Sequence, residues 1–122
     1  MTIFEAFLCL LIIHWVADFI FQTHWQATNK SKNNIALSSH VAVYTACLMV
    51  FSPFLFGLSL ATFSFVLING LLHFVTDYFT SRATSKLWAV GDTHNFFVIV
   101  GLDQLIHQFT LGLTAYWLFY YA

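Results

Sequence analysis

Four long apolar stretches constrain the fold of this chain more than any other feature. The sequence has 122 residues, of which 60% are hydrophobic and only 7% are charged. A soluble domain averages about 25% charged residues, and a membrane-spanning helix needs about 20 mostly apolar ones. We therefore expect a single transmembrane domain over residues 1–122, with spans at about 3–21, 35–51, 58–79 and 96–120.

The lipid interior requires these spans to be helices, because backbone polar groups find no hydrogen-bonding water there. The sequence thus predicts an all-α, polytopic membrane protein with a four-transmembrane-helix bundle. Pro53 is expected to close the second span, since proline cannot continue the helical hydrogen-bond ladder cheaply. Residues 22–34 and 80–95 are expected to be connections, and the apolar patch at 87–90 is suited to the membrane interface.

The basic residues predict the orientation in the cell (inner) membrane. All of them fall in the first and third connections: Lys30, Lys32, Arg82 and Lys86. The positive-inside rule places both connections in the cytoplasm and both termini outside. These side chains are also suited to attract an anionic substrate or a lipid head group. The net charge of −1 provides no basic field for nucleic acid.

Three of the spans carry a histidine and an aspartate four residues apart. The pairs are His14/Asp18, His73/Asp77 and Asp103/His107. Residues four apart share a helix face, and consecutive spans run in opposite directions. The reversed order in the last pair therefore puts every aspartate at the same end of the bundle. We expect a carboxylate layer near the cytoplasmic face, joined by His40, with the other imidazoles about one turn deeper.

Two of these pairs form a short internal repeat. The segments 14–19 and 73–78 share the pattern His, aromatic, Val, any residue, Asp, aromatic. This pattern favours two pseudo-repeated helical hairpins related by a twofold axis along the membrane normal.

Buried carboxylates need a compensating partner. An ionised aspartate at membrane depth costs at least about 2.5 to 3.5 kcal/mol, and no Lys or Arg lies in any predicted span. Two explanations stay open: a hydrogen-bonded or proton-relaying His–Asp network, and one or two divalent cations. Zinc is the first expectation, with manganese and iron as alternatives. The expected metal ligands are His14, Asp18, His40, His73, Asp77, Asp103 and His107.

Other polar residues on the same helix faces are expected to support these ligands by hydrogen bonding. They are Gln22, Tyr44, Asn69 and Gln104.

The polar strings as a whole resemble a known group of proteins. HWVADFIFQ (14–22), the isolated His40, HFVTDY (73–78) and DQLIH (103–107) are similar to small bacterial and phage-borne multi-pass membrane proteins defined only as a domain of unknown function. The resemblance covers nearly the whole chain and implies the fold and the site position, but no reaction. The histidines and aspartates are more loosely similar to those of membrane-bound metal-dependent hydrolases, whose full motif is absent from the sequence.

Three functions remain open from the sequence. The first is a metal-dependent hydrolase of a lipid-like or amphipathic substrate, with Asp18, Asp77 and Asp103 as candidate catalytic residues. The absence of G-x-S-x-G and the lone Cys9 and Cys47 favour a metal-activated water over a side-chain nucleophile. The second is a transporter or channel for divalent cations or protons, which a homo-oligomer would suit. The third is a structural or accessory subunit that uses the His–Asp network for packing.

Overall fold

The computed structural model describes residues 1–121, which form helices and no strands. α1 (Ile3–Trp15) continues into a π-helical turn, η1 (Val16–Ile20), and the short α2 (His24–Asn29) follows. The remaining helices are α3 (Asn34–Phe56), α4 (Leu60–Ala89) and α5 (Thr93–Ala115), the last continuing into a second π-helical turn, η2 (Tyr116–Tyr120). Four helices are long and apolar enough to cross a membrane: α1 with η1, α3, α4, and α5 with η2. The predicted all-α four-helix architecture is confirmed.

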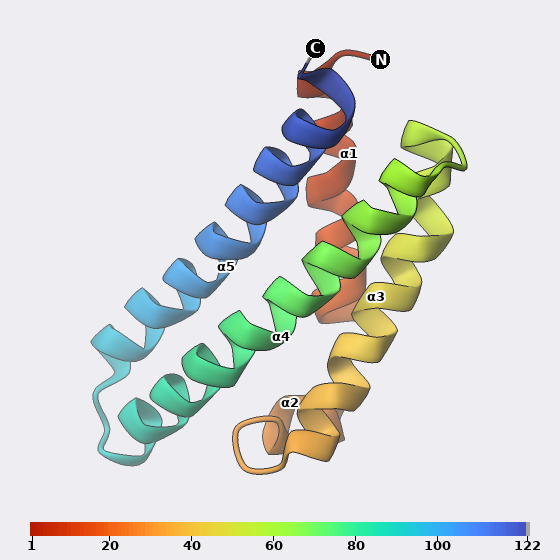
Figure 1. Ribbon diagram of the computed structural model, residues 1–122. Helices are drawn as coiled ribbons and strands as arrows, with labels where there is room; N and C mark the ends of the chain where they lie inside the picture. The colour runs from red at the N-terminus through yellow and green to blue at the C-terminus, as the bar shows by residue number, and fades with distance from the viewer. Residues whose placement is uncertain (122) are drawn as a thin grey trace.

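The four long helices run alternately up and down the bundle (Figure 1). Both termini and the α3–α4 connection lie at one end, where the Tyr120 hydroxyl donates to the Met1 carbonyl over 3.2 Å. The α2 segment and the α4–α5 connection lie at the opposite end, which we call the basic end because it carries Lys30, Lys32, Arg82 and Lys86.

Each helix begins at a side chain that accepts a hydrogen bond from a backbone N–H in its first turn, as good N-caps do. These residues are Thr2, Thr23, Asn33, Ser59 and Asp92. At the start of α5 the Asn95 side-chain amide also donates to Asp92, and this hydrogen bond lowers the pKa of the Asp92 carboxyl. Local sequence therefore sets where the helices begin.

Two helices extend beyond the predicted spans. α3 continues through Pro53 to Phe56 and ends where Gly57, at φ 79°, donates its N–H to the Pro53 carbonyl over 2.8 Å. α4 continues past residue 79 to Ala89, because the segment 80–89 contains no glycine or proline to stop it. Gly91, at φ 76°, then allows the chain to turn into α5.

The interior divides into an apolar half and a polar half. Leu10, Leu48, Phe65 and Leu111 are fully buried on the side of the termini, where the stacked rings of Phe56 and Phe119, at 4.0 Å, adjoin Phe65. Histidines and aspartates fill the half nearer the basic end. The outer surface is rich in exposed large apolar side chains, which is the pattern of a protein that faces lipid.

The short helix α2 is held against α3 by one glutamine. Gln26 completes a capping box with Thr23, and its side-chain amide also donates to the Ser39 hydroxyl over 2.8 Å. Gln26 is buried, with 4% of its surface exposed. This anchor fixes the end of α2, from which Lys30 points back toward the polar half of the bundle.

Candidate metal centre

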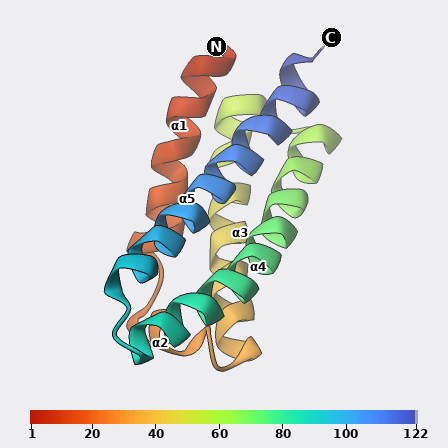
Figure 2. The same ribbon diagram turned by 90° about the vertical axis from the view of Figure 1, so that its left-hand side faces the viewer.

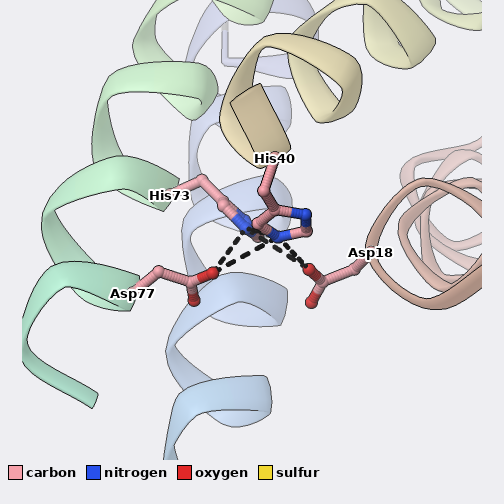
Figure 3. Close-up of side chains that lie close together, drawn as sticks. All are labelled: Asp18, His40, His73 and Asp77. Carbon is pink, nitrogen blue, oxygen red and sulfur yellow. Dashed lines mark hydrogen bonds and ion pairs between the residues drawn. The ribbon is translucent and has the colours of Figure 1, made fainter. Parts of the chain in front are cut away.

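Four side chains from three parts of the chain converge in the polar half of the bundle (Figure 3). Asp18 comes from η1, His40 from α3, and both His73 and Asp77 come from α4. All four are buried, with no more than 4% of any residue exposed. We call these four residues the tetrad.

The donor atoms of the tetrad lie at nearly equal separations. His40 Nε2 lies 2.9 Å from Asp18 Oδ1 and 3.3 Å from Asp77 Oδ2. His73 Nε2 lies 3.3 Å from Asp18 Oδ1 and 3.2 Å from Asp77 Oδ2. The two Nε2 atoms lie 3.1 Å apart. Ligands about 2.0 to 2.1 Å from a tetrahedral ion stand roughly 3.3 to 3.4 Å from one another, so the tetrad fits an ion of this geometry closely.

Hydrogen bonds alone leave the tetrad incompletely satisfied. An imidazole Nε2 carries at most one hydrogen, yet each Nε2 here faces two carboxylate oxygens and the other Nε2. Asp18 Oδ1 has no aligned hydrogen bond although His40 Nε2 lies 2.9 Å away. The Nδ1 atoms of His40 and His73 are buried and also lack a partner. Four lone-pair donors that meet at one point are better matched by a cation.

A second group of donors adjoins the tetrad. Asp18, Asp103 and His107 bring ligand atoms within 4.8 Å of one another. His107 Nε2 lies 3.0 Å from Asp77 Oδ1 and 3.2 Å from Asp103 Oδ1. Asp77 thus presents one oxygen to the tetrad and the other to His107, and Asp18 belongs to both groups.

The surrounding polar residues orient these carboxylates. Gln104 accepts from or donates to three of them in turn: its Oε1 lies 2.8 Å from His14 Nε2, and its Nε2 donates to Asp18 Oδ2 over 3.3 Å and to Asp103 Oδ2 over 3.1 Å. The Thr80 hydroxyl donates to Asp103 Oδ1 over 2.6 Å. The aspartates are therefore held by neutral donors as well as by imidazoles.

Aromatic stacking fixes the plane of the central imidazole. The His73 ring lies between two others, with its centroid 3.9 Å from that of Tyr44 and 4.0 Å from that of His107. The Tyr44 hydroxyl also lies 3.3 Å from His14 Nδ1. Packing therefore limits the rotation of His73 and keeps its Nε2 directed at the tetrad.

A cleft of about 170 Å³ leads to these groups from the basic end. Its lining includes Asp18, Asp77 and Asp103, and Asp103 is the most exposed of the three, with 14% of its side chain accessible. Lys30 reaches into the cleft and places its Nζ 3.2 Å from Asp77 Oδ2.

The structure brings most of the predicted site residues together. Asp18, His40, His73, Asp77, Asp103 and His107 all belong to the tetrad or the adjoining group. The reversed Asp–His order on α5 does align the aspartates at one end, as the antiparallel arrangement requires. Asp18 pairs with His40 on the next long helix, and Asp77 pairs with His107 on the next, which is consistent with the predicted repeat of two hairpins.

Other predicted residues lie outside the two groups. His14 instead contacts Gln104 and Tyr44. Asn69 bonds to Phe65 and Thr114, toward the apolar half. Gln22 lines the cleft without contacting a ligand, and its Oε1 is buried without a partner.

The basic residues also have different positions. Arg82 bonds to Asn34 and stacks on Tyr78, with its guanidinium carbon 3.7 Å from the ring centroid. Of the four basic residues, Lys30 alone is among the residues that line the cleft.

Sequence reasoning missed two contacts that shape the site. Lys30 was predicted only near the entrance, but it pairs directly with Asp77, a residue distant in sequence, because α2 folds back against α3. Thr80 bonds to Asp103 on another helix. Its position three residues after Asp77 puts it on the same helix face, which is the signal that pointed to it.

Comparison with known proteins identifies a family for the chain. Residues 6–121 match the family described as "Protein of unknown function (DUF3307)", and the chain belongs to this family. No curated protein and no solved structure matches it.

Proposed function

We propose that this DUF3307 protein is a membrane-embedded, metal-dependent hydrolase that binds its ion through the tetrad. The observation that carries the proposal is the near-equal spacing of the four donor atoms, between 2.9 and 3.3 Å for the five separations given above. Two imidazole nitrogens and two carboxylate oxygens suit zinc first, and also manganese or iron. An ion bound there would polarise a substrate ester oxygen and make a bound water more acidic.

Asp103 is the best candidate for the general base. It lies outside the tetrad, lines the cleft and is the most accessible carboxylate of the site. In our proposal it accepts a proton from the attacking water and passes it to the leaving alcohol, so that water is added across the ester bond. Thr80 and Gln104 hold its two oxygens in position for this transfer.

The adjoining group offers a place for a second ion. His107, Asp103 and Asp18 supply donors there, and Asp77 has one oxygen directed to each group. Paired ions that share a carboxylate are common in hydrolytic enzymes. The number of bound ions therefore distinguishes a single-metal site with Asp103 as base from a two-metal site.

One-sided access favours an enzyme over a pore. The cleft opens at the basic end, which the positive-inside rule assigns to the cytoplasm. On the opposite side of the tetrad the core is closed by Tyr44, Leu48 and Phe65, each no more than 1% exposed. A transporter would need a polar path through this half.

Elemental analysis tests the metal site directly. The full chain, purified in mild detergent with a tag free of histidine, should carry about one or two equivalents of a transition metal. Asp77→Asn, which replaces a carboxylate oxygen by an amide, should lose it. Asp92→Asn is the matched control, because asparagine caps a helix as well as aspartate does and Asp92 lies far from the site at the start of α5.

Two results would contradict the proposal. A chain that binds no more metal than Asp77→Asn, even after the metal is added back, would leave a structural His–Asp network as the better account. Metal-dependent ion flux into vesicles without hydrolysis of any ester would favour the transporter.

A further inference from the structure

The cleft beside the tetrad has two chemically different walls. One wall is polar and includes Lys30, Ser81 and Thr84. The other is apolar and consists of Phe19 from η1 and Val100 from α5. An amphipathic molecule would therefore find a place for each of its two ends.

The polar wall carries unused hydrogen-bonding capacity. Ser81 is only 8% exposed, and its hydroxyl has no partner. Lys30 brings an ammonium group to the same cleft, 3.2 Å from Asp77 Oδ2. An ion bound through that oxygen would compete with Lys30 for it and leave the ammonium available to an anion. A buried hydroxyl and an ammonium together suit the oxygens of a phosphate.

An apolar groove of about 570 Å³ lies between α1 and α5. α1 and α5 are in contact along one side of the bundle, and Figure 2 views this side from α5. The groove faces outward, because Phe4 is 67% and Phe109 58% exposed. It is lined by Ile3, Phe4, Phe7, Leu105, Phe109 and Leu113, together with Gln108 and Gly112.

One stripe of α5 runs from the cleft to the groove. Gly101, Leu105, Gln108 and Gly112 are spaced three or four residues apart, so they share a helix face. Leu105, Gln108 and Gly112 line the groove, and Val100 and Gln104 line the cleft. A side chain at Gly101 would meet no atom within 4 Å, so the stripe is open between them.

We infer that the substrate is a membrane lipid with an anionic phosphate head group. The head group binds in the cleft against Lys30 and Ser81, and the acyl chain lies along the seam between α1 and α5. This inference rests on the proposed hydrolase and specifies its substrate class. The lipid reaches the tetrad sideways from the bilayer, since the groove is exposed on the outer surface of the bundle.

Photo-crosslinking tests where a lipid binds. The full chain is placed in phosphatidylcholine bilayers with a trace of phosphatidic acid that carries a diazirine on its acyl chain. We expect labelling concentrated on the α1 and α5 residues of the groove, several-fold above that on Leu71, an exposed residue of α4. The same diazirine on phosphatidylcholine should label the groove several-fold less.

Three variants sharpen the test. Gly101→Leu fills the open part of the stripe and should reduce groove labelling several-fold, with Leu71→Phe as a control of similar apolar bulk. Leu105→Trp provides a second obstruction if Gly101→Leu does not fold. Lys30→Gln should remove the preference for phosphatidic acid. Excess inorganic phosphate should compete weakly, because it lacks the acyl chain.

Three results would overturn the inference: labelling spread evenly around the bundle, equal labelling by both lipids, or a crosslinked second copy of the chain in the groove. Metal content measured on the same samples separates this inference from the proposed function. Bound metal without selective labelling contradicts the lipid substrate and leaves the hydrolase standing. Selective labelling without bound metal contradicts the hydrolase.

Discussion

The two His-x-x-x-Asp pairs of this chain have the same spacing but different surroundings. On α4, His73 Nε2 and Asp77 Oδ2 both belong to the tetrad and lie 3.2 Å apart. On the first long helix, Asp18 joins the tetrad but His14 does not. His14 has both ring nitrogens next to neutral partners, Gln104 at 2.8 Å and Tyr44 at 3.3 Å. The spacing brings a histidine to the right face, and its neighbours decide whether it is a ligand or a support.

Local helix geometry contributes to this difference. α4 is a regular α-helix through its pair, whereas α1 changes at Val16 to the π-helical turn that contains Asp18. A π-turn has more residues per turn and changes the angle between side chains four apart. The His14–Asp18 separation is accordingly longer, at 3.5 Å. π-turns inside α-helices occur frequently at functional sites.

The largest expected effect is from the loss of His73. His73→Gln removes one of the four donors of the tetrad, and we expect the metal to be lost on dialysis, as measured by elemental analysis. His24→Gln is the control, because His24 is an exposed histidine at the start of α2. Retention of a full equivalent in His73→Gln would show that the ion is bound elsewhere.

The same substitution at His14 should be milder. His14→Gln leaves all four donors of the tetrad in place but removes contacts to Gln104 and Tyr44, which orient their neighbours. Partners of this kind typically change metal affinity by about 10- to 100-fold, so we expect weaker binding with unchanged stoichiometry in a competition titration with a chelator. If His14→Gln and His73→Gln behave alike, the distinction between the two pairs is wrong.

Asp103 tests the second hairpin further. Asp103→Asn should retain the ion of the tetrad, because Asp103 is not one of its donors. In a two-metal site the content should fall by about half, and in a single-metal site it should not change. Ester hydrolysis should fall by about 10²- to 10⁴-fold in either case, because the general base is lost. Unchanged hydrolysis would remove Asp103 from the catalytic role.

The smallest effect is expected at the α2 anchor, which only the first hairpin has. Gln26→Ala removes the capping interaction with Thr23 and the bond to Ser39. We expect a loss of about 1 kcal/mol in stability, measured by thermal unfolding in detergent, with metal content unchanged. Thr28→Ala is the control, because its hydroxyl bonds only within exposed α2. A loss of metal in Gln26→Ala would mean that α2 does more than position Lys30.

The number of helices and most of the site followed from local patterns. Apolar length predicts the spans, and the reversed order of Asp103 and His107 aligns the carboxylates once neighbouring helices are antiparallel. The extension of α4 to Ala89 was not predicted, because polar residues were taken to end a membrane span although they continue a helix readily.

The site details that escaped prediction depend on contacts between distant segments. Lys30 reaches Asp77 only because Gln26 fixes α2 against α3. The role of His14 depends on Gln104, which lies on the last helix. No spacing within one helix encodes these contacts, so they required the packed structure.

X-ray absorption spectroscopy of the metal-loaded protein tests the central claim most directly. If the tetrad binds zinc, the spectrum should show about four nitrogen and oxygen ligands at roughly 2.0 to 2.2 Å, of which two are imidazoles. The imidazole scattering should diminish in His73→Gln and remain in His14→Gln. A six-coordinate shell of oxygen ligands without imidazole, unaffected by His73→Gln, would contradict the tetrad as the metal site.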